Sequence, residues 1–152
     1  PETFDPNTDQ KYLYIGSKKL TDELEGTPLN VGKALLSPTR SYAPVMYKIL
    51  AEMHGKIDSL VHNTGGALSK VLHFIDDVRI VKDNIFDTPP IFDLIQKESG
   101  TSWEEMYTVF NMGQRMEIYL DEKDAQQVID ICKSFEIDAQ IMGYVEAADK
   151  AE

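Results

Sequence analysis

Residues Ile57–Phe74 read IDSLVHNTGGALSKVLHF, and this stretch decides how the chain folds. Its first part, Ile57–Val61, has the length and β-branched content of a buried strand. The pair Gly65-Gly66 follows, and apolar residues then recur at helical spacing over Ala67–Phe74. The stretch therefore predicts a strand, a glycine turn and a helix.

The glycine turn is the first candidate functional feature. Two residues without Cβ let a ligand approach the backbone closely, and N–H groups at the start of a helix attract anions. His62 and Thr64 flank the turn, where their side chains can reach the same ligand. The spacing alone favours a purely structural connection, because short glycine motifs have many false positives.

Length and charge restrict the classes of function. The 152 residues suit one domain with a real core, and 42% hydrophobic with 27% charged residues is an ordinary globular balance. The net charge of −11 argues against binding to nucleic acid or to anionic membranes. It leaves room for a local anion site built from backbone N–H groups.

Cysteine and histidine usage excludes two further classes of site. Cys132 is the only cysteine, so no internal disulfide forms, a reducing cytoplasm is favoured, and the thiol is predicted to lie in the core. With one cysteine, the scattered His54, His62 and His73 cannot form a zinc cluster, and we expect no metal ligand.

No apolar stretch has membrane-spanning length. Because the chain starts at Pro1, we interpret it as part of a longer protein.

The first quarter of the chain is predicted to be an arm followed by a helix. Residues 1–26 carry turn formers and charge, which predicts a linker or poorly ordered arm left by truncation. Within it, Tyr12–Ile15 could form an edge strand or pack on the domain. Thr27 is the predicted N-cap and Pro28 the first residue of a helix over Leu29–Leu36.

A second helix and a second strand surround the central stretch. Apolar spacing predicts a helix over Tyr42–Met53 that ends at Gly55, and Arg40 before it is interpreted as solvated or capping. Asp77–Lys82 reads as a strand. With the strand at Ile57–Val61 it predicts a βαβ unit, which favours a parallel, right-handed connection.

Capping signals predict two helices in the next part of the chain. Pro89 and Pro90 open the first helix, and Gly100 ends it. Thr101 and Ser102 each begin a capping-box pattern for the second helix.

The C-terminal part is predicted to be a strand, a helix and a strand. Asn111–Gly113 stops the preceding helix, and Met116–Leu120 alternates as a strand. Asp121 caps a helix of about four turns, and a last strand over Ala139–Val145 is interrupted at Gly143. The predicted fold class is α/β (α+β), a mixed sheet flanked by helices, with one domain over 27–148 and a frayed tail over 149–152.

Four segments together carry a family resemblance. They are LLSPTRSY (Leu35–Tyr42), VHNTGG (Val61–Gly66), PPIFDLIQ (Pro89–Gln96) and EEMYTVFNMG (Glu104–Gly113). From about Leu35 to the end of the last strand, the chain resembles the C-terminal domain of the aminoimidazole ribonucleotide synthetase family, the phosphoribosylformylglycinamidine cyclo-ligases. Formylglycinamide ribonucleotide amidotransferase and selenophosphate synthetase share this fold but not the last segment.

The resemblance implies a reaction and a set of site residues. Family members use ATP and Mg²⁺ to phosphorylate the formamide oxygen of formylglycinamidine ribonucleotide, and nitrogen attack then closes the ring to aminoimidazole ribonucleotide in purine biosynthesis. The motifs that match here imply a catalytic residue and residues that bind phosphate or substrate. These are His62 for catalysis and Thr64, Gly65, Gly66, Asn111 and Gly113 for binding.

The resemblance also implies partners outside this chain. The family's N-terminal half, which resembles the part that carries most nucleotide and Mg²⁺ contacts and the dimer-forming sheet, is absent here. We therefore expect a homodimeric, cytoplasmic full enzyme that binds ATP and the ribonucleotide. This chain alone is expected to be inactive and mostly monomeric.

Two departures keep alternatives open. The family has a third glycine where this chain has Ala67, which we expect to fit the first turn of the helix, and an asparagine-leucine-proline sequence where it has Ser69–Val71. A non-catalytic ligand-binding or regulatory module is therefore one alternative, and another superfamily member of the amidotransferase or selenophosphate synthetase type is a second.

The turn itself generates an expectation about anion binding. A phosphate or sulfate is expected at Thr64-Gly65-Gly66, held by backbone N–H groups without any lysine. An exposed His62 would add a donor whose charge depends on pH, so binding is expected to tighten modestly toward pH 6.

Overall fold

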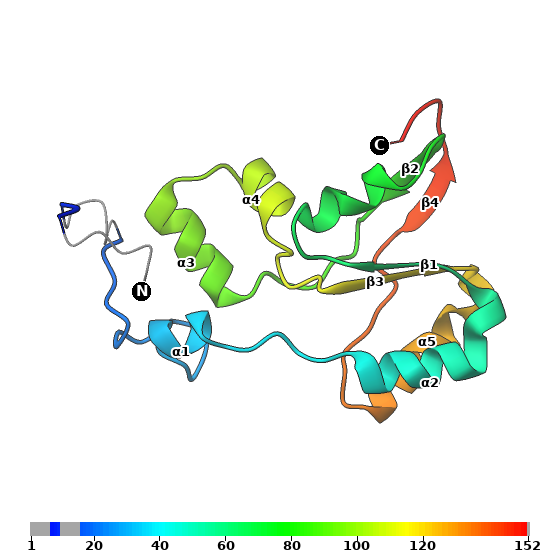
Figure 1. The fold of residues 1–152 in the computed structure, drawn as a ribbon, viewed down its shortest axis with the longest axis horizontal. Helices are drawn as coiled ribbons and strands as arrows, with labels where there is room; N and C mark the ends of the chain where they lie inside the picture. The colour runs from blue at the N-terminus through cyan, green and yellow to red at the C-terminus, as the bar shows by residue number, and fades with distance from the viewer. Residues whose placement is uncertain (1–6, 10–15, 152) are drawn as a thin grey trace.

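The computed structural model describes residues 7–9 and 16–151, and Figure 1 shows their arrangement. The predicted segment Tyr12–Ile15 lies outside the described residues. Helices and strands alternate along the chain, which confirms the mixed fold class. Their bounds are α1 Val31–Leu35, α2 Ala43–Met53, η2 His54–Lys56, β1 Ile57–His62, η3 Ala67–His73, β2 Val78–Val81, α3 Pro90–Ser99, α4 Trp103–Val109, β3 Met116–Leu120, α5 Glu122–Ser134 and β4 Tyr144–Ala147.

The strands form two small antiparallel sheets. β1 pairs with β3, and β2 pairs with β4. The predicted parallel βαβ unit is therefore wrong, because β1 and β2 belong to different sheets. An alternating pattern shows which residues share a face of a strand, but it does not encode the partner strand, and both partners here come from the C-terminal half of the chain.

The main core lies where α2 and α5 pack on the β1–β3 sheet. Val45, Ile49 and Met53 of α2 meet Val128 and Cys132 of α5, and all five are buried. The two helices lie side by side below the sheet in Figure 1. The prediction that the cysteine is a core residue is confirmed, and burial raises the pKa of its thiol, which keeps it protonated and unreactive at neutral pH.

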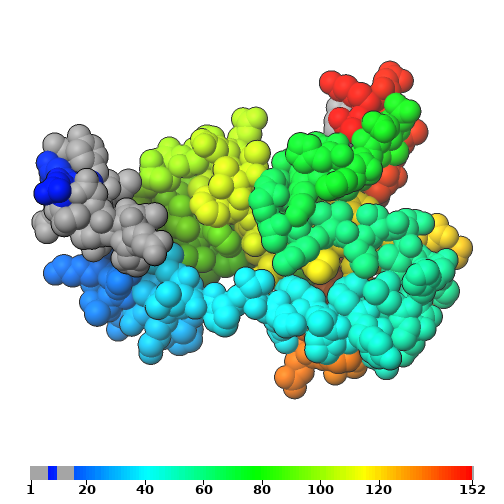
Figure 2. Space-filling view, viewed as in Figure 1, coloured from blue at the N-terminus to red at the C-terminus, as the bar shows by residue number. Residues whose placement is uncertain are grey.

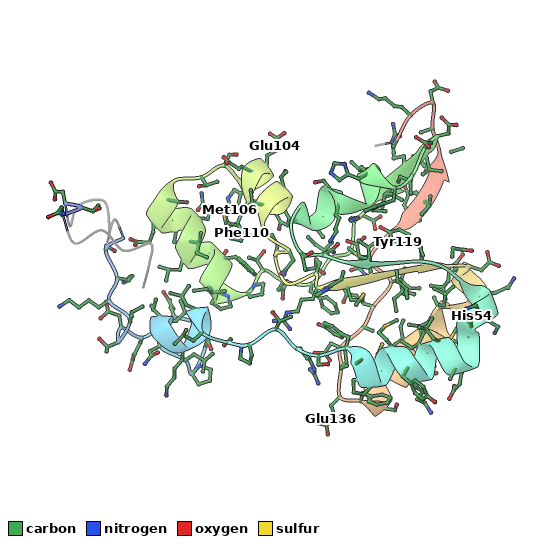
Figure 3. The ribbon with its side chains drawn as sticks, viewed as in Figure 1. His54, Glu104, Met106, Phe110, Tyr119 and Glu136 are labelled. Atoms are coloured by element: carbon green, nitrogen blue, oxygen red, sulfur yellow. The ribbon has the colours of Figure 1, made fainter. Side chains whose placement is uncertain are left out.

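A second layer lies on the other side of β1 and β3. η3 contacts α4, and α4 contacts α3; Figure 2 shows η3 in green beside α4 in yellow on one face of the molecule. On α4, Met106 is fully buried and Glu104 is exposed (Figure 3). The segment 103–113 is thereby placed against the helix that follows the glycine turn.

Most of the predicted helix ends are confirmed. Pro44 lies in the first turn of α2, Pro90 opens α3, and Gly100 ends α3 with φ 67°. Of the two overlapping capping patterns, the one that starts at Ser102 is used, since the Ser102 hydroxyl accepts from the Glu105 N–H at 3.2 Å. α2 ends at Met53, before the glycine predicted to stop it, and one turn of 3₁₀ helix follows.

The predicted start of α1 is wrong. Asn30 is the N-cap, and its Oδ1 accepts from the Lys33 N–H at 2.8 Å. The Thr27 hydroxyl instead accepts from the Leu29 N–H at 3.3 Å, in a turn before the helix. Asparagine and threonine are both favourable N-cap residues. Asn30 takes the N-cap position because its β-bridge with Glu23 fixes the chain there.

The Arg40 side chain caps the C-terminal end of α5, whereas the side chain at its N-cap position makes no capping hydrogen bond. Arg40 donates to the carbonyls of Phe135 and Glu136 at 3.5 and 3.2 Å, so its interpretation as a capping residue is confirmed. Asp121 occupies the N-cap position, but its carboxylate accepts from Lys123 Nζ at 2.7 Å and makes no capping hydrogen bond.

The segment before α1 contacts the rest of the domain. Leu24 is buried, Gly32 donates its N–H to the Leu20 carbonyl at 2.8 Å, and the Ser17 hydroxyl donates to Glu98 at 2.7 Å. Residues 17–24 are thus hydrogen-bonded to α1 and α3.

The last strand is shorter than predicted. β4 begins only after Gly143, because residues 139–142 run beside the loop after β2, where Asn84 donates its N–H to the Met142 carbonyl at 3.0 Å. A Cβ on Gly143 would lie 1.7 Å from the Val81 carbonyl oxygen, so only glycine fits this approach. Within the described residues, no helix is long and apolar enough to cross a membrane.

We predict that Ser102→Ala lowers the free energy of unfolding by about 1 kcal/mol, because it removes the hydroxyl that caps α4. Thr101→Ala is the matched control, since Thr101 lies outside the cap and should cost less than half as much. Urea denaturation of both variants checks this, and an equal loss in the two would show that the cap is assigned to the wrong residue.

Candidate functional site

The glycine turn forms as predicted at the end of β1. Thr64 donates its N–H to the His62 carbonyl at 2.8 Å, and Ala67 donates to the Thr64 carbonyl at 2.9 Å. Gly66 has φ 84°, a left-handed conformation that glycine adopts without strain. The turn therefore reverses the chain between β1 and η3.

Two backbone donors of the turn have no partner among the described residues. Among the hydrogen bonds of the described residues, none uses the N–H of Gly65 or of Gly66. His62, Thr64 and Gly65 are exposed, and a Cβ added at Gly65 would meet nothing within 4 Å. An oxyanion can reach these donors without displacing any protein atom, which is the arrangement that phosphate-binding turns use.

The helix after the turn is not the α-helix that the spacing predicts. η3 is a seven-residue 3₁₀ helix, so it carries a smaller dipole than a long α-helix would. The sequence analysis also expected no lysine at the turn, but Lys70 Nζ lies within hydrogen-bonding distance of it. It donates to Thr64 Oγ1 at 2.8 Å and to the His62 carbonyl at 3.1 Å. These partners are neutral oxygens, so the positive charge stays available to an anion.

Ala67 does not sit in an ordinary first helical turn, contrary to the expectation. Its φ is 43°, and the residue is fully buried. An L-residue with positive φ is strained by contact between Cβ and its own backbone. Glycine would therefore adopt this backbone conformation with less strain than alanine. Burial of the alanine methyl group offsets part of that strain.

The second predicted motif lies beside the first. His62 pairs with Met116 in the β1–β3 ladder, and Asn63 donates its N–H to the Arg115 carbonyl at 2.9 Å. The turn at Asn111–Gly113 therefore joins β3 where the glycine turn leaves β1. The structure brings the two motifs together across antiparallel strands.

Asn111 and Gly113 have structural roles within their own turn. Asn111 Oδ1 accepts from the Gly113 N–H at 2.9 Å, and Gln114 donates its N–H to the Asn111 carbonyl at 2.8 Å. Gly113 has φ 93°, and a Cβ there would lie 2.9 Å from Pro89 Cδ. Glycine is needed at 113 because both the backbone conformation and the space exclude a side chain.

A buried polar cluster below the glycine turn was missed in the sequence. Glu117 is its centre: Oε1 accepts from Asn63 Nδ2 at 2.6 Å and from Lys82 Nζ at 2.7 Å, and Oε2 accepts from the Tyr119 hydroxyl. Burial and the Glu117 carboxylate together raise the pKa of Tyr119, so its hydroxyl remains a donor. Gln114 adjoins the cluster, because its carbonyl accepts from Asn63 Nδ2 at 2.8 Å.

One signal for this cluster was present in the sequence. The apolar residues of β3 alternate with Glu117 and Tyr119, which must therefore share the other face of the strand. In the structure, Lys82 at the end of β2 and Asn63 before the glycine turn contact Glu117 on that face. Asn63 lies between His62 and Thr64, and no sequence pattern singled it out as a functional residue.

Cavities lie beside the turn but do not include it. One cavity of about 310 Å³ is lined by Gly113, Arg40 and the core side chains of α2 and α5. A second, more open one of about 340 Å³ is lined by Lys82, Leu68 and Tyr107 among others. Neither is lined by any residue of Thr64–Gly66, so the turn lies on an open surface of this chain.

Comparison with known families identifies the family of this domain. The family described as AIR synthase related protein, C-terminal domain, matches residues 15–152. The chain belongs to this family. The match covers both motifs, β1 with its glycine turn and the turn before β3.

Three curated relatives of this domain have the same name. The chain is 35% identical over 116 residues to a phosphoribosylformylglycinamidine cyclo-ligase of Methanopyrus kandleri, covering 76% of this chain and 33% of the relative. It is 36% identical to that of Methanocaldococcus jannaschii, with the same coverage. For Syntrophus aciditrophicus the figures are 30% identity, 92% of this chain and 41% of the relative. The chain thus spans between a third and two fifths of the length of these relatives.

The strain at Ala67 yields a prediction. Ala67→Gly should change the free energy of unfolding by less than about 1 kcal/mol, because relief of about 1 kcal/mol of positive-φ strain offsets the loss of a buried methyl group. Ala67→Val should destabilise by about 2 kcal/mol, since the added carbons overfill the site and β-branching disfavours positive φ. Urea denaturation of the two variants measures this; a valine variant as stable as the wild type would contradict the strained geometry.

Proposed function

We propose that this chain is the C-terminal domain of a phosphoribosylformylglycinamidine cyclo-ligase, in which the glycine turn binds a phosphate group. One observation carries the proposal. The N–H groups of Gly65 and Gly66 have no partner among the described residues, Gly65 is exposed, and the ammonium group of Lys70 lies at the same turn, in a chain that belongs to this family. His62 and Thr64 are exposed next to these donors and can contact the same ligand.

The proposed reaction asks little covalent chemistry of the protein. ATP transfers a phosphoryl group to the formamide oxygen of the ribonucleotide and leaves ADP; an amidine nitrogen then attacks the formyl carbon, and the former formamide oxygen leaves as part of phosphate. Placement of the phosphate and stabilisation of negative charge are the main tasks. The N–H groups of Gly65 and Gly66 would hold a phosphate oxygen, the Thr64 hydroxyl would donate to it, and Lys70 would balance its charge. His62 is proposed as the catalytic side chain, at the edge where the reacting part of the ribonucleotide would lie.

Magnesium does not fit this chain by itself. Within the part of the chain that the structure describes, no group of three or more His, Cys, Asp or Glu side chains is placed to hold a metal ion. In the proposal, Mg²⁺ and most contacts to ATP belong to the N-terminal domain of the full enzyme, as the family resemblance implies. That domain would also form the homodimer, and this chain alone would be monomeric.

A non-catalytic module of the same fold is the second candidate. It is favoured by Ala67, whose positive φ shows that the turn is built for glycine at this position. A selenophosphate synthetase or amidotransferase is a third, but the names of the relatives favour the cyclo-ligase. An assay for ATP-dependent formation of aminoimidazole ribonucleotide by the natural full-length protein separates the first candidate from the other two.

Gly65→Val in that full-length protein should abolish cyclisation and leave the fold intact. The backbone at Gly65 does not have positive φ, and a Cβ there meets no atom within 4 Å, so valine can be accommodated. Its side chain would cover the two free N–H groups and exclude the phosphate. Steady-state kinetics and circular dichroism measure the two properties.

The matched control is Gly55→Val. Gly55 is also exposed, and a Cβ on it also meets nothing within 4 Å, but it lies in η2 at the other end of β1. The control should keep full activity. Full activity with unchanged substrate affinity in the Gly65 variant would show that the turn is only a connection.

The 152-residue chain should not catalyse ATP-dependent ring closure. Its glycine turn is open rather than enclosed, and neither cavity includes it, so this chain alone cannot hold two reactants in contact. Incubation of the purified chain with ATP, Mg²⁺ and formylglycinamidine ribonucleotide tests this. Turnover at rates typical of enzymes, about 1 per second or more, would contradict it.

A further inference from the structure

One buried carboxylate links both ends of the glycine turn. Asn63 immediately precedes the turn, and its Nδ2 donates to Glu117 Oε1 at 2.6 Å. Leu68 immediately follows it, and its carbonyl accepts from Lys82 Nζ at 2.7 Å. The same Nζ donates to the same Glu117 Oε1, also at 2.7 Å. Residues 64–67 are therefore spanned by a single chain of hydrogen bonds, which we call the Glu117–Lys82 clamp.

Both side chains of the clamp are largely buried, although stability does not require an ion pair at this place. The side chain of Glu117 is 2% exposed and that of Lys82 is 13% exposed. Removing two charges from water costs several kcal/mol per ion, and an apolar pair of similar volume is often at least as stable. Stability alone therefore gives no reason for an ion pair here, whereas its directional hydrogen bonds fix two atoms at a set separation.

Hydrogen bonds within residues 62–70 shape the turn locally, but few side chains tie it to the rest of the domain. Gly65 and Gly66 have no side chains, and Thr64 is exposed. Beyond the clamp, the bonds that tie the turn to another strand are made by Asn63, to the carbonyls of Gln114 and Arg115. All of these act at the first end of the turn. At the other end, Lys82 donates to the Leu68 carbonyl from outside the segment, while Ser69 Oγ donates to the Gly66 carbonyl at 2.8 Å from within it.

We propose that Lys82 and Glu117 are positioning residues that set the geometry of the phosphate-binding turn. They touch no substrate; they act through Leu68 and Asn63, which fix the spacing of the Gly65 and Gly66 N–H groups. The inference rests on the proposed function, because the ligand whose binding they control is the phosphate of the ribonucleotide or of ATP. Loss of the clamp weakens binding of that phosphate even where the fold is as stable as before.

The double variant Lys82→Met with Glu117→Gln separates positioning from stability. It removes both buried charges, methionine fills the space of the lysine chain, and glutamine still offers an oxygen to Asn63. Each single variant should be less stable than the double variant, because each leaves one polar partner unmatched. The double variant nevertheless cannot hold the Leu68 carbonyl.

Steady-state kinetics of the natural full-length protein is the first readout. In the double variant, KM for the ribonucleotide or for ATP should rise about tenfold while kcat changes by less than about threefold, as expected when uniform binding is lost. The matched control is Lys48→Met with Glu52→Gln, which removes an exposed ion pair of 3.0 Å on α2 and should change neither constant. Wild-type KM values in a double variant with a wild-type denaturation midpoint would overturn the inference.

Hydrogen–deuterium exchange of the same proteins without ligand is the second readout, and it does not depend on the activity. The peptide that contains Gly65 and Gly66 should exchange about tenfold faster in the double variant, with no change in peptides from α2. An unchanged turn peptide overturns the clamp. Absence of cyclisation by the wild type, together with faster exchange in the double variant, instead overturns the proposed function and leaves the clamp standing.

If the double variant does not fold, Glu117→Gln alone replaces it. This change keeps both side-chain lengths and an acceptor for Asn63; it weakens the attraction that holds Lys82 in place and replaces the oxygen that accepts from the Tyr119 hydroxyl by an NH2 group. It should raise the same KM about threefold and speed exchange of the turn peptide. Unchanged values for both would be evidence against positioning by the ion pair.

Discussion

The buried ion pair between Glu117 and Lys82 is the interaction on which the rest of the structure depends. Glu117 lies in β3 of one sheet, and Lys82 directly follows β2 of the other. Each sheet has only two strands, and an isolated two-stranded sheet is marginally stable in water. The ion pair joins the sheets under η3, while the apolar residues of α2 and α5 support β1 and β3 from the opposite side.

This arrangement explains why the strands that carry the candidate site are firmly packed while the glycine turn itself is exposed. The strand β3 is covered on its two faces, by an apolar core and by a polar cluster, so the ends of β1 and β3 are held firmly. The glycine turn and the turn before β3 project from those ends, side by side. Backbone donors on a rigid base bind an anion with little cost in conformational entropy, which is the property that a phosphate site needs.

Local signals predicted the site only in part. The turn at Gly65-Gly66 and the exposed His62 were found because glycine pairs and strand ends have local signatures. Asn63, Lys82 and Glu117 were not found, since each looks like an ordinary polar residue in its own segment and they meet only when three segments converge. Lys70 was missed for a related reason: its contacts with Thr64 and His62 form only when the chain reverses at the turn.

The sequence by itself determined the order of the elements, most helix ends, the core face of α5 and the position of both glycine turns. These depend on spacing and on residues such as Pro90, Gly100 and Ser102, whose preferences act over a few positions. The tertiary structure alone decided that the strands pair antiparallel in two sheets, that Ala67 takes positive φ, and that Glu117 is buried. Those outcomes depend on contacts between residues 30 to 70 positions apart, which no local pattern records.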